Sequence, residues 1–349
     1  MKKTLAFLLA LLLSAALAAC AGPASPAEPA DVPAEYAELA PVTLIGADSS
    51  GKGAAGQLFG EYVAARVSER TGGRLRIDYH PNGELGGDAD LIRQMQSNEI
   101  QLVVCQTAPI VSFVPEMAVF DLPMFFAGFD GDTIDAALNG DNAFTRDMGA
   151  AYEAQRLHLL GFLQSATYRL TTANAELRTL DDFKNLQIRT MDNRNHMAFW
   201  QAIGAEPTPL AWAEVYFALQ SGAIDAQENA ADTCVSAGFQ DVQRCLACTN
   251  HILYCNQICI SAEAWDALAP AYRDALEQAV ADAVAWMRPQ LAQLDADSKQ
   301  TLREGGMTVV EYDEAFFDEV LALDGVRALY ERIGSETGGL SDELAAALG

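Results

Sequence analysis

From residue 42 onward, two kinds of hydrophobic pattern take turns along the chain. Short apolar or alternating runs are typical of strands, and in the first half they are VTLIGA (42–47), RLRIDYH (74–80) and IQLVVCQ (100–106). Between them lie stretches with apolar residues at helical spacing, GQLFGEYVAARVSERT (56–71) and DLIRQMQSN (90–98). Strands that alternate with helices in this way predict α/β units and a largely parallel sheet.

The second half repeats this pattern. Its strand-like runs are LHLLGFLQ (157–164), YRLTTAN (168–174), the end of DDFKNLQIRTM (181–191) and NHILYCNQICIS (250–261), and its helical stretches are NHMAFWQAIG (195–204) and EVYFALQSG (214–222). A long helical pattern extends from Glu263 to about Trp286, and Pro289 is expected to kink or interrupt it, with more helix beyond. Two α/β lobes with crossing strands and a long connecting helix are the architecture expected of a protein that closes around a ligand between its lobes.

The first twenty residues have the layout of an export signal. Two lysines precede an apolar segment (residues 4–13), which is short for a membrane-spanning helix and fits a signal peptide over residues 1–19. The sequence Leu-Ala-Ala-Cys at 17–20 matches the bacterial lipobox, in which the cysteine is acylated. Cys20 is therefore the expected lipidation site. The mature protein is expected outside the cytoplasm, anchored to the bacterial cell membrane.

Composition limits the possible partners. Residues 20–41 are dominated by proline, alanine and acidic side chains, and they predict an extended, solvated tether behind the lipid anchor. The formal net charge of −26 would repel nucleic acid, so no nucleic-acid partner is expected. An anionic ligand stays possible, because the field of distant surface charges is screened over ~8 Å and a few buried arginines can outweigh it.

Six cysteines follow the lipobox, and four of them form the pattern C-x2-C-x6-C-x3-C: Cys245, Cys248, Cys255 and Cys259. This spacing suggests zinc, but the intervening sequence is typical of a strand and has no glycine turn for a metal knuckle. Cys255, Gln257 and Cys259 would share one strand face, where cysteine behaves as a small apolar residue. We expect no metal there. A disulfide such as Cys245 with Cys255 stays open in an exported protein.

A glycine-rich loop gives the alternative function. Gly51-Lys52-Gly53-Ala54-Ala55-Gly56 has the G-x-G-x-x-G pattern of dinucleotide-binding proteins, and Asp78 follows at a suitable distance. This alternative is an exported oxidoreductase that binds a dinucleotide. Residues 48–50 argue against it, because they separate the strand from the loop where an immediate turn is needed. Hydrolase motifs such as G-x-S-x-G and H-E-x-x-H are absent from the sequence, so we expect no enzymatic activity and no cofactor.

A co-linear series of short segments carries a family resemblance. The segments are HPNGELG (80–86), FDLPMFF (120–126), LQIR (186–189), GAEPTP (204–209), WAEVY (212–216), ALQSG (218–222), DAQEN (225–229) and TNH (249–251). The series resembles the substrate-binding subunits of tripartite ATP-independent periplasmic (TRAP) transporters. This resemblance implies capture of a small organic acid (a sugar acid, a sialic acid or a dicarboxylate) and its delivery to the membrane subunits of the transporter. The protein is expected to be a monomer.

The resemblance also implies a fold and its boundaries. The expected fold is α/β and two-lobed, like periplasmic binding proteins, with a ligand cleft between the lobes. Residues 42–166 with 255–290 would form lobe I, and residues 167–254 with 291–349 would form lobe II.

The same resemblance assigns ligand-binding residues. Arg189 matches the arginine that forms a salt bridge to the ligand carboxylate, and its planar fork can grip a carboxylate with two hydrogen bonds. Arg169 matches a second, assisting arginine. Asn229 would contact the ligand through its amide, which both donates and accepts. Trp212 would line the pocket, and Gln106 would face the ligand from a strand end.

Several of these assignments have a structural alternative. Arg189 could be a surface arginine paired with Asp192, Arg169 could belong to a structural ion pair, and Trp212 could pack in the core. The identity of the acid stays open, as does the type of cell envelope. A metal ion that bridges the ligand, held through Glu228 and its neighbour Gln227, also stays open.

Overall fold

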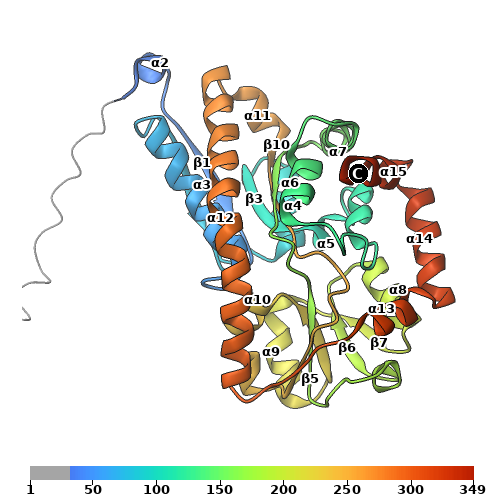
Figure 1. Cartoon of the computed structure of the whole chain (residues 1–349). Coiled ribbons are helices and arrows are strands. Elements are labelled where there is room, and N and C mark those ends of the chain that lie inside the picture. Colours follow the sequence, from blue (N-terminus) through green and yellow to red (C-terminus); the bar gives the residue numbers. More distant parts are fainter. Residues whose placement is uncertain (1–31) are drawn as a thin grey trace, which may run out of the picture.

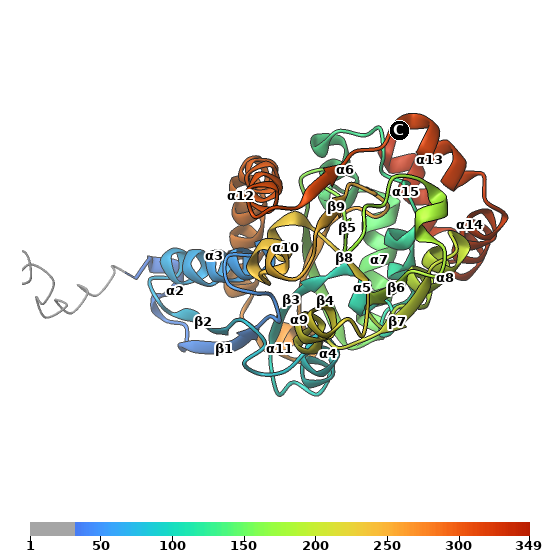
Figure 2. The same cartoon turned by 90° about the horizontal axis from the view of Figure 1, so that it is seen from below.

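The computed structural model describes residues 32–349, so the predicted signal peptide, Cys20 and most of the predicted tether lie outside the described residues. Within 32–349, no helix is both long and apolar enough to cross a membrane. The described chain forms two α/β lobes, and the long helix α12 (Pro270–Glu304) runs along both of them (Figures 1 and 2). The predicted two-lobed α/β fold is confirmed.

Lobe I contains the strands β1 (Val42–Ala47), β2 (Leu75–His80), β3 (Leu102–Gln106), β4 (Leu157–Leu163) and β10 (Asn256–Ser261). Its helices are α3 (Ala55–Arg70), α4 (Asp88–Gln96), α5 (Thr107–Ile110), α6 (Gly131–Asn139), α7 (Ala143–Ala154) and α11 (Ala262–Ala267), with the 3-10 helix η1 (Pro115–Asp121). The sheet order is β2-β1-β3-β10-β4.

Lobe II contains the strands β5 (Leu170–Ala173), β6 (Gln187–Thr190), β7 (Glu206–Pro209), β8 (Ala226–Asn229), β9 (Cys245–Ala247) and β11 (Thr308–Val310). Its helices are α8 (Arg194–Ala202), α9 (Trp212–Ser221), α10 (Ala231–Ser236) and α13 (Glu314–Leu321), with the 3-10 helices η2 (Leu180–Phe183) and η3 (Phe239–Asp241). The sheet order is β11-β9-β5-β8-β6-β7.

Both sheets are mixed, whereas the sequence predicted largely parallel sheets. In lobe I, β1 is parallel to β2 and β3, but β10 is antiparallel to β3 and β4. In lobe II, β6 is parallel to β7 and β8, but β5 is antiparallel to β8 and β9. The antiparallel strands are the two that enter from the opposite lobe, since β5 follows β4 of lobe I and β10 follows β9 of lobe II. This exchange of strands interleaves the lobes.

The two crossover segments lie side by side between the lobes. Tyr168 pairs with Leu253 in an isolated antiparallel bridge. On either side, Arg169 N donates to Ile252 O at 2.8 Å and Tyr254 N donates to Thr167 O at 2.8 Å. Backbone hydrogen bonds therefore join the two connections, and any movement of one lobe against the other must bend both together.

The long helix differs from its prediction at Pro270, and at Pro289 it continues without the interruption that was one of the two predicted outcomes. The pattern that starts at Glu263 is broken, because α11 ends at Ala267 and Pro270 begins a separate helix, α12. Proline suits the first turn of a helix and disfavours helical backbone in the residue before it. Pro289, in contrast, does not interrupt α12. It lies on an exposed face, where the carbonyl that loses its N–H partner can reach water.

Two chain ends depart from the predicted boundaries. The last helix, α15 (Leu340–Leu348), packs on α6 and α7 of lobe I, although residues 291–349 were assigned to lobe II. The preceding helix α14 (Asp324–Glu336) packs on α8 of lobe II and connects the two lobes.

At the N-terminal end of the described residues, the predicted tether stops before residue 41. Tyr36 of the short helix α2 (Ala34–Ala37) is buried, and its ring stacks on that of Tyr272 in α12, with 5.9 Å between the ring centroids. This aromatic side chain therefore fixes the end of the predicted tether to the folded body.

The six cysteines of the described chain are buried free thiols. Cys255 and Cys259 lie in one core cluster with Cys105, as small apolar residues would. Burial raises the pKa of the Cys259 thiol to about 12. Cys245 lies in β9 of lobe II, in a strand that the sequence did not reveal. In residues 32–349, no group of three or more His, Cys, Asp or Glu side chains is placed so that it could hold a metal ion.

Candidate ligand-binding site

Two adjoining cavities lie between the lobes. The inner one, of about 40 Å³, is lined by Ser49, Ser50, Gly51, Asp88, Cys105, Gln106, Arg189, Met191, Trp212, Asn229 and Thr233. The outer one, of about 530 Å³, shares Ser49, Asp88, Arg189, Met191 and Trp212 with it and is otherwise lined mainly by residues of α4, of the segment around α5 and of the β7–α9 connection. Because their walls are shared, we treat them as one cleft. Four of the five predicted ligand-binding residues line the cleft; Arg169 does not.

Arg189 holds the central position in this cleft. It is the third residue of β6, next to β7 and β8, and only 3% of its surface is exposed. Its Nε and Nη2 donate to the carbonyl of Leu210 at 2.9 and 2.7 Å. Nη1 is buried and has no hydrogen-bond partner in the part of the chain that the structure describes. Arg189 forms no ion pair with Asp192 or with any other carboxylate among residues 32–349, so the alternative of a paired surface arginine is wrong.

The unused donors of Arg189 lie at one end of the guanidinium. Arginine has five N–H groups, and the Leu210 carbonyl takes only Nε–H and one hydrogen of Nη2. The remaining Nη1 and Nη2 hydrogens can bind two oxygens of one carboxylate. Burial lowers the pKa of Arg189 to about 10, while Glu228 opposes this shift. A buried guanidinium without a counter-charge is costly, and an entering carboxylate would supply that charge.

Trp212 fixes the plane of this guanidinium. It is the first residue of α9, and its ring lies 5.7 Å from Cζ of Arg189. On another side it meets Phe239 edge to face, at 5.8 Å between ring centroids. Trp212 is therefore both a wall of the cleft and a packing residue, and the two interpretations from the sequence are compatible.

Gln106 and Asn229 face each other across the lobes. Each is the last residue of a strand, β3 in lobe I and β8 in lobe II. Nε2 of Gln106 donates to Oδ1 of Asn229 at 3.5 Å, and the backbone N–H of Ala230 donates to the same oxygen at 3.2 Å. These bonds leave the amide nitrogen of Asn229 free to donate to a ligand. The cleft is thus lined from both lobes by polar groups that a closed form could use together.

Arg169 occupies a different place from the one that its sequence suggested. Its exposed fraction is 2%, its Nε pairs with the Glu228 carboxylate and its Nη1 donates to Oε1 of Gln106. Its Nη2 donates to the backbone carbonyl of Glu228 at 2.9 Å. Arg169 therefore forms the structural ion pair that was its alternative. It reaches the cleft through Gln106, whose amide it orients.

A buried network of charges extends behind Arg169. Glu228 also accepts from Nδ1 of His196 and from Nε2 of His251, both at 3.2 Å. Nε2 of His196 donates in turn to Asp121 of lobe I at 3.0 Å. Because both carboxylate oxygens of Glu228 are occupied in this way, the geometry does not favour a metal ion that bridges a ligand to Glu228.

The protonation of this network follows from its geometry. Burial disfavours a charged His196, but the carboxylates of Glu228 and Asp121 outweigh burial and raise its pKa to about 9. At neutral pH this pKa favours the imidazolium form of His196, whose two ring nitrogens face a carboxylate of each lobe. Burial likewise opposes the charge of Glu228, yet Arg169 and His196 hold its pKa well below the usual value. Sequence reasoning missed this network, since its members lie far apart along the chain.

Asp88 lines the cleft itself, and sequence reasoning missed it as well. It begins α4, lines both cavities and accepts a hydrogen bond from Ser49 Oγ at 2.5 Å. The available signal was its place in the loop after β2, because the carboxyl ends of β1, β2 and β3 share one edge of the parallel part of the sheet.

The glycine-rich loop does not form a dinucleotide site. The first N–H of α3, that of Ala55, already donates to the Asp232 carboxylate at 2.9 Å. A bound phosphate would need this position, where Asp232 would repel it. A Cβ at Gly56 would lie 2.4 Å from Ser50 Oγ, so close packing accounts for this glycine.

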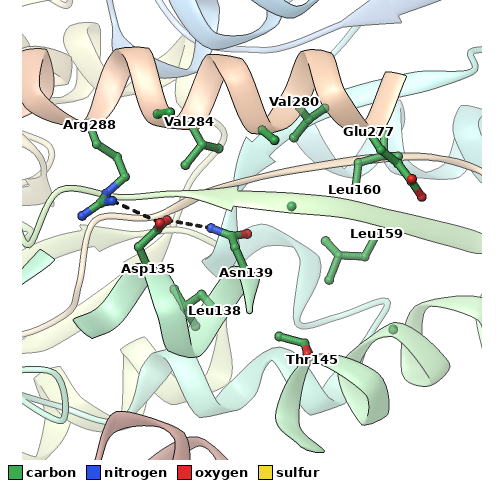
Figure 3. Close-up of a pocket in the computed structure, with 14 residues that line it drawn as sticks. Asp135, Leu138, Asn139, Thr145, Leu159, Leu160, Glu277, Val280, Val284 and Arg288 are labelled. Atoms are coloured by element: carbon green, nitrogen blue, oxygen red, sulfur yellow. Dashed lines mark hydrogen bonds and ion pairs between the residues drawn. The ribbon is translucent and has the colours of Figure 1, made fainter. Parts of the chain in front are cut away.

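A separate hollow of about 350 Å³ lies between α6, α7, β4 and α12 (Figure 3). Its cation, Arg288, pairs with Asp132 at 2.6 Å and with Asp135 at 3.1 Å. Asn139 also bonds Asp135, at 2.9 Å. The hollow therefore offers an anion no free positive charge, in contrast to the cleft at Arg189.

Comparisons with known proteins agree with this geometry. The sequence model of the DctP family, bacterial extracellular solute-binding protein family 7, matches residues 50–322. A solute-binding protein of Verminephrobacter eiseniae is 29% identical over 270 residues, which cover 77% of this chain and 79% of the relative. The 2,3-diketo-L-gulonate-binding periplasmic protein of Escherichia coli is 27% identical over 267 residues, which cover 75% of this chain and 80% of the relative. The sugar acid binding protein of Advenella mimigardefordensis, solved in complex with galactonate, has a TM-score of 0.80 at 25% identity and covers 88% of this chain and 99% of its own.

Proposed function

Because the chain belongs to family 7 of the bacterial extracellular solute-binding proteins, we propose that its cleft captures a small organic acid for the membrane subunits of a TRAP transporter. A sugar acid, a sialic acid or a dicarboxylate would each supply the carboxylate. One observation carries this proposal: Arg189 is a buried guanidinium with no carboxylate partner among residues 32–349, and its unsatisfied Nη1 belongs to a side chain that lines the cleft.

The arrangement of the cleft suits binding and release. A carboxylate that enters loses its hydration, and two charge-assisted hydrogen bonds from Arg189 offset that loss. Gln106 of lobe I and Asn229 of lobe II would bind the same ligand, so the ligand would favour the closed arrangement of the lobes. Membrane subunits that recognise this arrangement would receive only loaded protein.

The proposal is one of binding without catalysis. Cys105 is the thiol that lines the cleft, and burial holds its pKa well above the usual value, so it is a poor nucleophile. The protein would act as a monomer, held near the membrane by a lipid on Cys20. The docking of Tyr36 on α12 would place the end of the tether on lobe I.

A thermal-shift screen tests this function. Purified protein would be heated with a panel of sugar acids, sialic acids, dicarboxylates and 2-oxo acids, with neutral sugars as controls. An acid present at 100 times its Kd adds ~2.7 kcal/mol of stability, which is readily measured. We expect at least one acid to stabilise the wild type and to leave Arg189→Ala unchanged. Stabilisation by neutral sugars alone, or equal stabilisation of both proteins by the acid, would contradict the proposal.

A further inference from the structure

The carboxylate of Asp88 lies in the wall of a cleft that is built for an anion. Asp88 and Arg189 line the same inner cavity, yet they form no ion pair within 4.0 Å in the described chain. Burial raises the pKa of Asp88, and the nearby Arg189 guanidinium opposes that rise. An acid that is bound at Arg189 therefore shares the inner cavity with a second carboxyl group, that of Asp88.

A purely structural role does not account for this position. Acidic residues favour the first turn of a helix, and Asp88 begins α4. Asp90 lies in the same turn and already supplies a negative charge near the N-terminus of α4. Its side chain lies at the surface and pairs with Arg93 at 3.1 Å. Asp88 instead bonds Ser49 of lobe I, so its carboxylate is held against the cleft by a hydroxyl whose lone pairs stay available.

The cations around the cleft cannot balance a second ligand carboxylate. Among the lining residues, the cations are Arg189 and Arg93, and Arg93 is engaged by Asp90. Arg169 lies behind the wall and is neutralised by Glu228. Besides Asp90, which pairs with Arg93, the lining carboxylates are Asp88 and the exposed Asp192 of the outer cavity. A dianion would thus meet one unpaired cation and two carboxylates, of which only Asp88 shares the inner cavity with Arg189.

We propose that the cleft selects acids with a single carboxylate and a hydroxylated remainder, and that Asp88 with Ser49 is the specificity-determining pair. The carboxylate binds Arg189, a ligand hydroxyl donates to Asp88, and a second carboxylate is rejected by repulsion from Asp88. This inference rests on the proposed function and narrows its substrate class to polyhydroxy monocarboxylates.

Matched pairs of acids test the inference. D-galactonate and galactarate, D-gluconate and D-glucarate, and D-erythronate and meso-tartrate each differ only at one end, where CH2OH is replaced by a carboxylate. Calorimetric titration at pH 7.5 would give the Kd of each acid for the wild type, for Asp88→Asn and for Glu99→Gln. Glu99 is exposed and lies outside the cleft, so its variant removes the same charge without touching the pair.

We expect the wild type to bind the monocarboxylate at least about tenfold more tightly in any pair that it binds, a difference of ~1.4 kcal/mol. Asp88→Asn should reduce this ratio to less than about threefold, mainly by gaining affinity for the diacid, and Glu99→Gln should keep it. The ratio of the two Kd values for the wild type is measured without any variant, so it still tests the inference if Asp88→Asn fails to fold.

Three results would overturn the inference: a diacid that binds the wild type as tightly as its monoacid, a ratio that Asp88→Asn leaves unchanged, or no binding in any pair. The proposed function would still stand if another acid stabilised the wild type and not Arg189→Ala. The proposed function and the inference would both be wrong only if no acid of the wider panel stabilised the wild type and left Arg189→Ala unchanged.

Discussion

The guanidinium of Arg189 lies over the indole ring of Trp212, with Cζ 5.7 Å from the ring centroid. The carbonyl of Leu210 holds its Nε edge at the same time. With one face and one edge fixed, the unpaired Nη1 end has a defined direction before any ligand arrives. Such preorganisation lowers the entropic cost of binding.

Loss of the Trp212 ring should therefore weaken binding without unfolding the protein. A cation–π contact of ~0.5–2 kcal/mol corresponds to roughly twofold to thirtyfold in Kd, and we expect Trp212→Ala to fall in this range with Trp212→Phe nearer the wild type. Titration with the best acid of the screen measures it. Trp286→Ala is the control, because Trp286 is 49% exposed on α12, outside the cleft. Unchanged affinity in Trp212→Ala would show that the ring does not orient Arg189.

His196 should carry a positive charge at pH 8. Its pKa is raised to about 9, from an ordinary value of about 6.5, because two carboxylates face its ring nitrogens. Nitrogen-15 NMR of the imidazole rings should show both His196 nitrogens protonated at pH 8, and His196→Asn would assign the signal. His251 should be neutral at that pH, since burial lowers its pKa.

The same group sets a pH dependence of stability. His196 has a higher pKa in the folded state than in the unfolded state. Its protonation therefore stabilises the fold fully below about pH 6.5, and this contribution is lost as the pH rises through about 9. We expect unfolding free energy to fall over this window, and to fall less in His196→Asn. A neutral His196 at pH 8, or equal slopes in both proteins, would contradict the assignment.

Removal of the Glu228 charge should be strongly destabilising. Glu228→Gln leaves Arg169 and His196 buried without their common partner, and loss of one member of a buried pair typically costs ~3–5 kcal/mol. Chemical denaturation would measure the loss. Glu214→Gln removes an exposed acid from the first turn of α9 and should cost well under ~1 kcal/mol. Similar losses in the two variants would mean that the network contributes little.

Membrane attachment should depend on Cys20. The Leu-Ala-Ala-Cys site and the Pro/Ala-rich segment behind it motivate this prediction, which lies outside the described residues. Cys20→Ser should release the protein from the membrane fraction or leave it unprocessed. Mass spectrometry of the wild type should find acyl chains on Cys20. The prediction would be contradicted if the wild type carried no acyl chains and the variant fractionated with the membrane as before.

Much of the fold was readable from local pattern. The strands β1, β2 and β4 were predicted to within one residue, because their apolar runs are long and bounded by turns or helices. The short strands β9 and β11 were missed, since three residues give no period to detect. Pro270 begins a new helix whereas Pro289 lies inside one, and a periodic pattern does not distinguish these two positions of proline.

The site was readable only in part. Arg189, Trp212, Gln106 and Asn229 were predicted from family motifs, and the structure brings them to one cleft. The ion pair of Arg169 with Glu228 depends on the antiparallel register of β5 and β8, which local sequence does not reveal. The contact of His196 with Asp121 joins the two lobes, and only the folded chain shows it.

The central claim is that Arg189 binds the carboxylate of the ligand, and calorimetric titration of Arg189 variants with the best acid of the screen tests it most directly. Arg189→Ala should weaken binding by ~2–5 kcal/mol, or roughly thirtyfold to several-thousandfold in Kd. Arg189→Lys should also weaken it, because lysine lacks the planar fork. Arg194→Ala, which removes an exposed arginine paired with Glu336, should bind like the wild type. If folded Arg189→Ala binds the acid within about threefold of wild type, the carboxylate is held elsewhere and the account of this cleft is wrong.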